Sequence, residues 1–173
     1  MMTIICGTNR AESNTFRVLE FCVKTAADQG IDATVLNLED IPENLFFEGR
    51  YGSPVESFTQ ILDKKIVPAS HILFVVPEYN GSYPGILKLF IDIAPPALWA
   101  GKKAALLGVA TGRSGNQRGL DHLMMVLHYL NMEVYSQKPL LSSIHHHISE
   151  DGDMRNEEYQ SLIENQIRGF RKF

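Results

Sequence analysis

Three short segments of the sequence combine glycine with hydroxyl, amide and charged side chains, and each of them follows an apolar run. They are residues 7–15 (GTNRAESNT), 77–84 (PEYNGSYP) and 111–116 (TGRSGN). Small polar residues let a ligand approach the backbone closely and supply hydrogen-bond donors to it. We therefore expect the chemistry of this chain to depend on ligands bound by these three segments.

The first segment suits a phosphate group. Thr8, Ser13 and Thr15 provide hydroxyl donors, and the planar guanidinium of Arg10 can grip two phosphate oxygens. A helix that begins near Asn14 would also turn its free N–H groups and the positive end of its dipole toward the same place. The alternative is a polar turn whose side chains only cap that helix.

The second and third segments suit a flat ring. Gly81 permits a planar ligand to approach the backbone, and Tyr79 or Tyr83 could stack on the ring or touch its edge. In the third segment, Gly112 and Gly115 could bring backbone against the opposite edge of the ring. The alternatives are a proline-bounded turn with surface tyrosines and a flexible connection between a strand and a helix.

The elements that must position these segments alternate along the chain. Apolar runs typical of strands lie at residues 3–6, 33–38, 72–76 and 104–109, with a fifth near 134–135 that could run on toward 141. Apolar residues at helical spacing lie at 19–26, 58–66, 87–94, 120–130 and 159–170. Residues 42–54 are expected to form a loop. This alternation predicts one domain over residues 1–173 with an open, mostly parallel α/β sheet, whose strands end at the three segments.

Composition excludes several classes of protein. The chain has 173 residues, of which 45% are hydrophobic and 21% charged, which is typical of a globular domain. A net charge of −4 provides no basic surface for nucleic acid or an anionic membrane. No apolar run approaches the roughly 20 residues of a membrane-spanning helix, and the N-terminus lacks the features of a signal peptide. With only two cysteines we expect a cytoplasmic protein that binds neither nucleic acid nor membrane.

Three further signals have simple structural interpretations. Cys6 precedes the phosphate-like segment as a phosphatase nucleophile would, but the Cys-x5-Arg pattern requires arginine where Glu12 stands. A carboxylate there would repel a phosphate dianion, so we expect a buried strand cysteine. His145-His146-His147 are adjacent residues that point in different directions, so no metal site is expected. Met124 and Met125 join an apolar stripe that would pack on the sheet or serve as a partner-binding face.

Together the three segments resemble the NADPH-dependent FMN reductase family. Residues 7–13 match its pattern G-S-x-R-x-x-S with threonine in place of the first serine. Residues 77–88 match P-E-Y-N-G-S-x-P-G-x-L-K at every fixed position. Residues 111–118 match T-G-x-x-G-G-x-R, except that Asn116 replaces the second of the paired glycines. The resemblance covers residue 3 to about residue 134.

The resemblance implies a flavodoxin-like fold, which is an open five-stranded parallel sheet in the order 2-1-3-4-5 with helices on both faces. It also implies FMN as cofactor and NADPH or NADH as co-substrate. No obligate catalytic side chain is expected, because the flavin carries the chemistry. The implied FMN-binding residues are Thr8, Arg10, Ser13, Asn14 and Thr15 at the phosphate, Pro77, Glu78, Tyr79, Asn80 and Gly81 at the ribityl chain and ring, and Thr111, Gly112 and Gly115 on the far side.

The partners implied by the resemblance are a small-molecule electron acceptor (a quinone, azo compound, flavin or metal ion) and further copies of the chain in a homodimer or homotetramer. Phe46, Phe47, Tyr51 and Trp99 are candidate exposed aromatic contacts between copies. Arg50, Arg113 and Arg118 are candidates to meet the 2′-phosphate of the coenzyme. Two other functions stay open: an electron carrier that does not oxidise NAD(P)H directly, and a ligand-sensing or scaffold protein that binds no flavin.

Overall fold

A parallel β-sheet forms the centre of the protein, and the computed structural model describes residues 1–42, 45–48 and 50–173 of the chain. The strands are β1 (Met2–Cys6), β2 (Ala33–Asn37), β3 (His71–Pro77), β4 (Lys103–Val109), β5 (Glu133–Val134) and β6 (Leu140–Leu141). Their order is β2-β1-β3-β4-β5, with β6 also paired to β4, and all of these pairings are parallel. The strand order predicted by the resemblance is confirmed.

The three central strands are buried on both faces. Every residue of β1 is buried, and so is every residue of β3 and β4 after the first. Such strands have continuous apolar runs in the sequence because helices cover both faces of the sheet. The interpretation of residues 72–76 as a strand is therefore confirmed.

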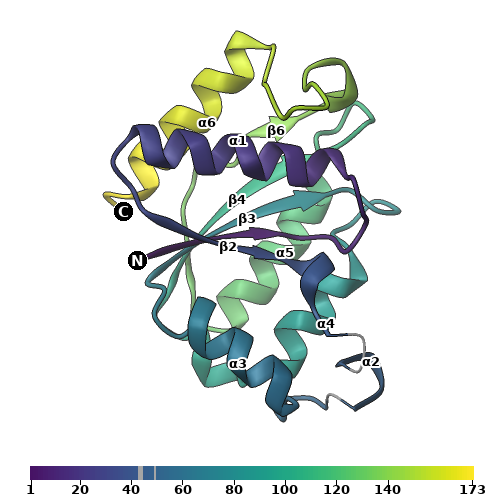
Figure 1. Cartoon of the computed structure of the whole chain (residues 1–173), viewed down its shortest axis with the longest axis vertical. Coiled ribbons are helices and arrows are strands. Elements are labelled where there is room, and N and C mark those ends of the chain that lie inside the picture. The colour runs from purple at the N-terminus through teal and green to yellow at the C-terminus, as the bar shows by residue number, and fades with distance from the viewer. Residues whose placement is uncertain (43–44, 49) are drawn as a thin grey trace.

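Helices form one layer on each side of the sheet (Figure 1). On one face lie α1 (Asn14–Asp28) and α6 (Glu157–Phe170), and on the other lie α3 (Glu56–Lys65), α4 (Gly85–Ile93) and α5 (Gln117–Tyr129). One turn of helix, α2 (Leu45–Glu48), and the 3₁₀ turns η1 (Leu38–Asp40), η2 (Pro96–Leu98) and η3 (Ile144–His146) occupy connections. Nowhere in the described chain does a helix combine the length and apolarity needed to cross a bilayer.

The edge strand expected near residues 134–141 is divided into β5 and β6. Between them, the side chain of Gln166 from α6 donates a hydrogen bond of 2.8 Å to the carbonyl of Leu106 in β4 and another of 3.0 Å to that of Gln137. The Gln166 side chain therefore bonds the Leu106 carbonyl of β4, which a continuous edge strand would have bonded instead. Pro139, next to β6, also lacks an N–H group for a strand ladder.

Two further expectations were wrong in part. Residues 42–54 contain the helix Leu45–Glu48 rather than loop alone. Trp99 is fully buried rather than exposed, because the turn at Pro96–Leu98 directs it against Phe90, with the ring centroids 5.9 Å apart. Tyr51 is 72% exposed, as expected. The side chains of Phe46 and Phe47 lie outside the described part of the chain.

Candidate functional site

The three predicted segments meet at the carboxyl edge of the sheet. They follow β1, β3 and β4, which are neighbours, and they surround a cavity of about 270 Å³. Eight of the thirteen predicted binding residues line it: Arg10, Ser13, Asn14, Thr15, Pro77, Glu78, Tyr79 and Thr111. Glu12, Val109, Ala110 and Ile144 complete the lining and were not predicted. Ile144 follows β6, so no local pattern in the three segments could have indicated it.

The first segment combines a helix cap with a set of free donors. The Ser13 side-chain oxygen accepts a hydrogen bond of 3.2 Å from the N–H of Phe16. Ser13 therefore caps α1, as the alternative interpretation of this segment predicted. The N–H groups of Asn14 and Thr15 belong to the first turn of α1 and have no acceptor within the helix. Because both residues line the cavity, it receives the positive end of the helix together with the Arg10 side chain.

Thr8 connects the first segment to the second. Its side chain is fully buried, and its Oγ1 lies 2.7 Å from the hydroxyl of Tyr79 and accepts a hydrogen bond of 3.2 Å from the N–H of Arg10. Thr8 is not among the residues that line the cavity. The Thr8 hydroxyl therefore holds two groups in place: the Tyr79 side chain and the backbone of Arg10.

The second segment is a tight hairpin turn. Tyr79 and Ser82 exchange backbone hydrogen bonds of 2.8 and 3.1 Å, and Asn80 and Gly81 both have positive φ, at 51° and 78°. Asn-Gly is the preferred pair for a turn of this type. The N–H groups of these two residues take no part in the turn's own bonds, so they are available at its tip. Tyr83 is half-buried against the core, and this burial raises the pKa of its phenol.

The third segment accommodates asparagine where the family pattern has glycine. Asn116 has φ of 71°, a left-handed conformation that asparagine tolerates better than most residues. Its buried side-chain amide donates a hydrogen bond of 3.0 Å to the carbonyl of Val76 in β3. Gly115 also has positive φ, and a Cβ there would lie 2.6 Å from the Cβ of Leu140. Gly115 therefore serves packing, whereas Gly112 has open space beside it.

A glycine in α5 that sequence reasoning missed brings this helix against the second segment. A Cβ at Gly119 would clash with Oδ1 of Asn116 and would lie 2.8 Å from backbone atoms of Ser82 and Tyr83. Nη1 of Arg118 lies 3.1 Å from the Cβ position of Gly81. A glycine inside an apolar helical stripe is the sequence signal for such close packing.

A second hollow of about 330 Å³ shares Glu78 with the cavity. It is lined by Glu78, Ser114, Gln117, Arg118 and Asp121, and the Ser114 hydroxyl donates a hydrogen bond to Glu78. The two hollows therefore adjoin each other on the two sides of this carboxylate. Three arginines were candidates to meet the 2′-phosphate of the coenzyme, and Arg118 is the one that lines this hollow. Arg50 belongs to the turn over residues 50–53, and Arg113 is an exposed residue of the third segment.

The donor set of this edge fits the parts of FMN. Arg10, the hydroxyls and the helix N–H groups suit a phosphate, the 79–82 turn presents free N–H groups to a ring edge, and Gly112 leaves space beside it. Arg10, Glu78 and Thr111 come from three different loops, and the cavity extends between them. A ligand with a charged end and a flat end would therefore contact all three segments.

The cysteines cannot supply a nucleophile at neutral pH. Burial raises the pKa of the Cys6 thiol to about 11, and burial raises that of Cys22 to about 12. Both thiols are free and buried, and for Cys6 this is the strand position that we expected. His145 and His146 are exposed at η3, and within residues 1–42, 45–48 and 50–173 no three His, Cys, Asp or Glu side chains are grouped to hold a metal ion.

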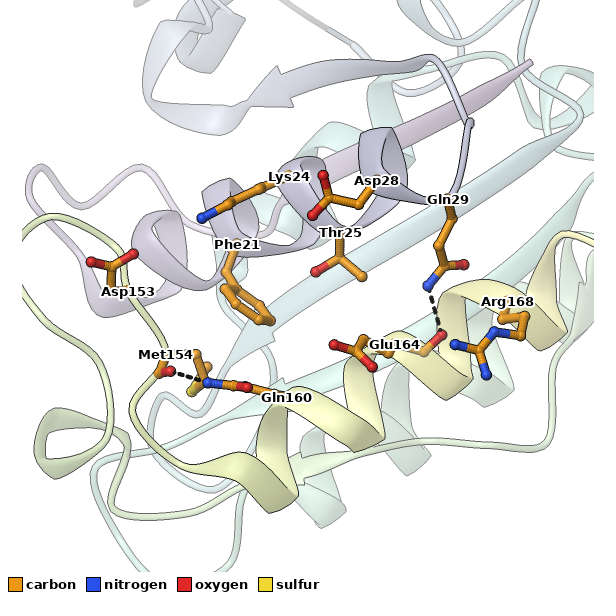
Figure 2. Close-up of a pocket in the computed structure, with 10 residues that line it drawn as sticks. All are labelled: Phe21, Lys24, Thr25, Asp28, Gln29, Asp153, Met154, Gln160, Glu164 and Arg168. Carbon is orange, nitrogen blue, oxygen red and sulfur yellow. Dashed lines mark hydrogen bonds between the residues drawn. The ribbon is translucent and has the colours of Figure 1, made fainter.

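Another groove, of about 400 Å³, lies between α1 and α6 and contains none of the predicted site residues (Figure 2). Gln29 at the end of α1 donates a hydrogen bond of 3.0 Å to the carbonyl of Glu164 in α6. Gln160 of α6 donates one of 2.5 Å to the carbonyl of Met154, which lines the other end of the groove. Its exposed charges have mixed sign: Lys24 and Arg168 beside Asp28, Asp153 and Glu164. These bonds mark the groove as the junction where the two helices pack.

Comparison with solved structures shows the same fold. An NADH:FMN oxidoreductase (EMOB) crystallised in its apo form aligns with a TM-score of 0.80 and 22% identity, covering 99% of this chain and 88% of that one. FerB, a flavoenzyme NAD(P)H:(acceptor) oxidoreductase from Paracoccus denitrificans, aligns with a TM-score of 0.79 and 22% identity, covering 99% and 94%. A two-electron-reduced flavodoxin from Megasphaera elsdenii aligns with a TM-score of 0.61. The flavodoxin-like architecture is therefore confirmed.

Sequence comparison identifies the family. An NAD(P)H:quinone oxidoreductase of Solanum tuberosum is 32% identical over 92% of this chain and 84% of its own length. An NAD(P)H-dependent FMN reductase of Pseudomonas aeruginosa is 29% identical over 80% of this chain and 76% of its own. The family model for NADPH-dependent FMN reductase matches residues 1–146. The chain belongs to the NADPH-dependent FMN reductase family, a family of oxidoreductases that use FMN and a reduced nicotinamide coenzyme.

Proposed function

We propose that this protein holds FMN across the carboxyl edge of β1, β3 and β4 and uses NADPH or NADH to reduce a small quinone. The observation that supports the binding site is the cavity shared by three loops that the sequence motifs identify independently. Arg10, Ser13, Asn14 and Thr15 bind the phosphate, with the helix N–H groups of α1. Thr8 positions Arg10 and Tyr79, as its buried hydrogen bonds indicate.

The ribityl chain and ring bind along the second and third segments. The cavity wall beside the ribityl chain is formed by Pro77, Glu78 and Tyr79. The N–H groups of Asn80 and Gly81 meet the edge of the flavin ring. Thr111 and Gly112 cover the far side of the ring, and Gly115 supports that loop by packing under Leu140. The chemistry that bound FMN would supply is hydride transfer from the coenzyme and onward electron transfer to the acceptor. The protein binds and orients it, so no single side chain is required as an acid or base in the flavin-reduction step.

Quinones are the favoured class of acceptor. The Solanum tuberosum relative is named for quinone reduction, and a Burkholderia relative that is 28% identical over 79% of this chain is named 2-hydroxy-1,4-benzoquinone reductase. A Staphylococcus haemolyticus relative at 29% identity is named FMN-dependent NADPH-azoreductase, so azo compounds are the second class to test. Free flavin and oxidised metal ions remain further acceptors of the same site.

The experiment mixes the FMN-loaded protein with NADPH without oxygen and then adds a quinone. We expect the yellow flavin colour to disappear with NADPH and to return, with one hydroquinone formed per NADPH consumed, when the quinone is added. An electron carrier would stay yellow until a separate reductase was supplied. A protein that binds no FMN at all would contradict the proposal at its first step.

We further propose that the chain acts in the cytoplasm as a homodimer or homotetramer. Tyr51, Met125 and Tyr129 are 72%, 62% and 83% exposed, and they line one apolar groove of about 380 Å³ beside α4 and α5. Exposed apolar side chains gathered on one surface are typical of protein–protein contacts. The groove also contains His122, whose contact with Ser82 connects it to the ring-binding turn.

A further inference from the structure

A histidine outside the predicted site stands beside the turn expected to hold the flavin ring. His122 lies in α5, and its Nδ1 is 2.9 Å from the Oγ of Ser82. Ser82 directly follows Gly81 and closes the turn through its backbone bonds with Tyr79. His122 is exposed in the single chain.

The surrounding contacts orient the imidazole. Because Nδ1 is hydrogen-bonded to Ser82, Nε2 is the ring nitrogen left for another partner. Arg118 lies one helical turn before His122, and residues four apart share a helix face. Nη1 of Arg118 is 3.1 Å from the Cβ position of Gly81, and Gly119 packs directly against Ser82. This face of α5 therefore runs along the outer edge of the turn.

We propose that His122, held by Ser82, donates the proton that completes reduction of the quinone; this inference rests on the function proposed above. Converting a quinone to a hydroquinone takes two electrons and two protons. FMN held at the Asn80–Gly81 turn and already reduced by NADPH would supply two electrons and one proton as a hydride, which would leave one quinone oxygen as an anion. That oxygen takes its proton from the Nε2–H of the His122 imidazolium, which becomes neutral and is reprotonated by solvent. The Arg118 guanidinium stabilises the anion before the proton arrives.

The charged groups around His122 are compatible with this role. Lys88 and Asp92 face it from α4 and form an ion pair of 2.7 Å, so their charges largely cancel. Tyr51 faces it from the turn over residues 50–53, and α5 itself contributes Arg118, Asp121 and Tyr129.

The first test measures the two half-reactions of the FMN-loaded enzyme separately. His122→Gln and Ser82→Ala are compared with His128→Gln, which changes another exposed histidine of α5. The enzyme is reduced with NADPH without oxygen and mixed with menadione over a range of about pH 5 to 9. In His122→Gln the quinone step should be slower than in the wild type by roughly 100-fold at low pH, and its rate should depend less on pH. Ser82→Ala should slow it less, and His128→Gln should match the wild type in both half-reactions.

A second readout follows the imidazole itself by ¹⁵N NMR in the oxidised, FMN-loaded protein. Ser82→Ala should move the Nδ1 signal of His122, and added menadione should move its Nε2 signal while leaving that of His128 unchanged.

A His122→Gln enzyme with the wild-type rate and pH profile would overturn this inference alone. So would a menadione titration that leaves the His122 signals of the loaded protein unmoved. A wild type that binds no FMN, or that once reduced passes no electrons to menadione, would instead overturn the proposed function, and this inference with it. If His122→Gln does not fold, the same measurements on Ser82→Ala decide the question.

Discussion

Arg10 is the only basic side chain among the residues that line the three-loop cavity, where it adjoins the first turn of α1. Hydroxyls and N–H groups can bind many polar ligands, whereas a guanidinium beside a helix N-terminus selects for an anion. Glu12 lines the same cavity, so the charge of Arg10 also offsets a carboxylate. We therefore expect the charge of Arg10 to strengthen the binding of a phosphate in this cavity.

Replacing Arg10 with alanine should weaken FMN binding while leaving the fold intact. Loss of a hydrogen bond to a charged group costs about 1.5–3 kcal/mol, which corresponds to a dissociation constant raised roughly 10- to 150-fold. Quenching of flavin fluorescence measures this constant. Lys24→Ala, an exposed cation of α1 in the other groove, is the matched control and should bind FMN normally. Equal affinities in Arg10→Ala and wild type would remove Arg10 from the site.

The buried thiols provide a second prediction at the scale of single residues. Because burial raises the pKa of Cys6 from 9.0 to about 11, its thiolate should be about 100-fold scarcer near pH 8 than that of a free thiol. Iodoacetamide should therefore label the folded protein very slowly and both cysteines promptly in denaturant. The folded state also holds these protons more tightly than the unfolded state. The free energy of unfolding should thus be unaffected below about pH 9 and fall as pH rises toward 11. Rapid labelling of native Cys6 would show that it is accessible.

Helix α5 and strand β4 lie against the binding loops through close contacts that only glycine allows. Gly119 lets α5 lie against the 79–82 turn. Gly108 lets the third segment lie against β4, since a Cβ at Gly108 would clash with the carbonyl oxygen of Gly115. Each contact joins a regular element to a binding loop. A distortion at either glycine would therefore be transmitted to the candidate site.

Gly119→Ala should push α5 away from the ring-binding turn. Overpacking of this kind costs about 1–3 kcal/mol of stability, and the displaced turn should also bind FMN more weakly. Chemical denaturation and FMN titration measure the two effects. The control is Gly85→Ala in α4, where a Cβ meets no atom within 4 Å, so stability and binding should stay close to the wild type. If both variants behave alike, close packing at Gly119 does not shape the turn.

Much of this architecture could be predicted from the sequence because its signals are local. Buried parallel strands have continuous apolar runs, and Ser13 and Pro84 mark the starts of α1 and α4. The features that were missed depend on contacts distant in sequence. Gln166 of α6 interrupts the edge strand by bonding Leu106 of β4, which is 60 residues away in sequence. The burial of Thr8 likewise depends on Tyr79, 71 residues away.

At the scale of the whole molecule, the groove beside α4 and α5 is the surface through which we expect copies to associate. Met125→Glu or Tyr129→Glu would place a charge on this apolar surface and should lower the sedimenting mass to that of one chain, 19.4 kDa. The control is Val67→Glu, an exposed apolar residue following α3 at 51% exposure, which should leave the oligomer intact. A wild type that sediments as one chain, or equal dissociation in the control, would contradict the proposed association.

The account depends most on where FMN binds, and a crystal structure of the FMN-loaded protein measures this directly. We predict a phosphate beside Arg10 and the first turn of α1, with the ring against the Asn80–Gly81 turn and Thr111 on its far side. Flavin bound between α1 and α6, or with its phosphate at the turn instead of at Arg10, would contradict the account.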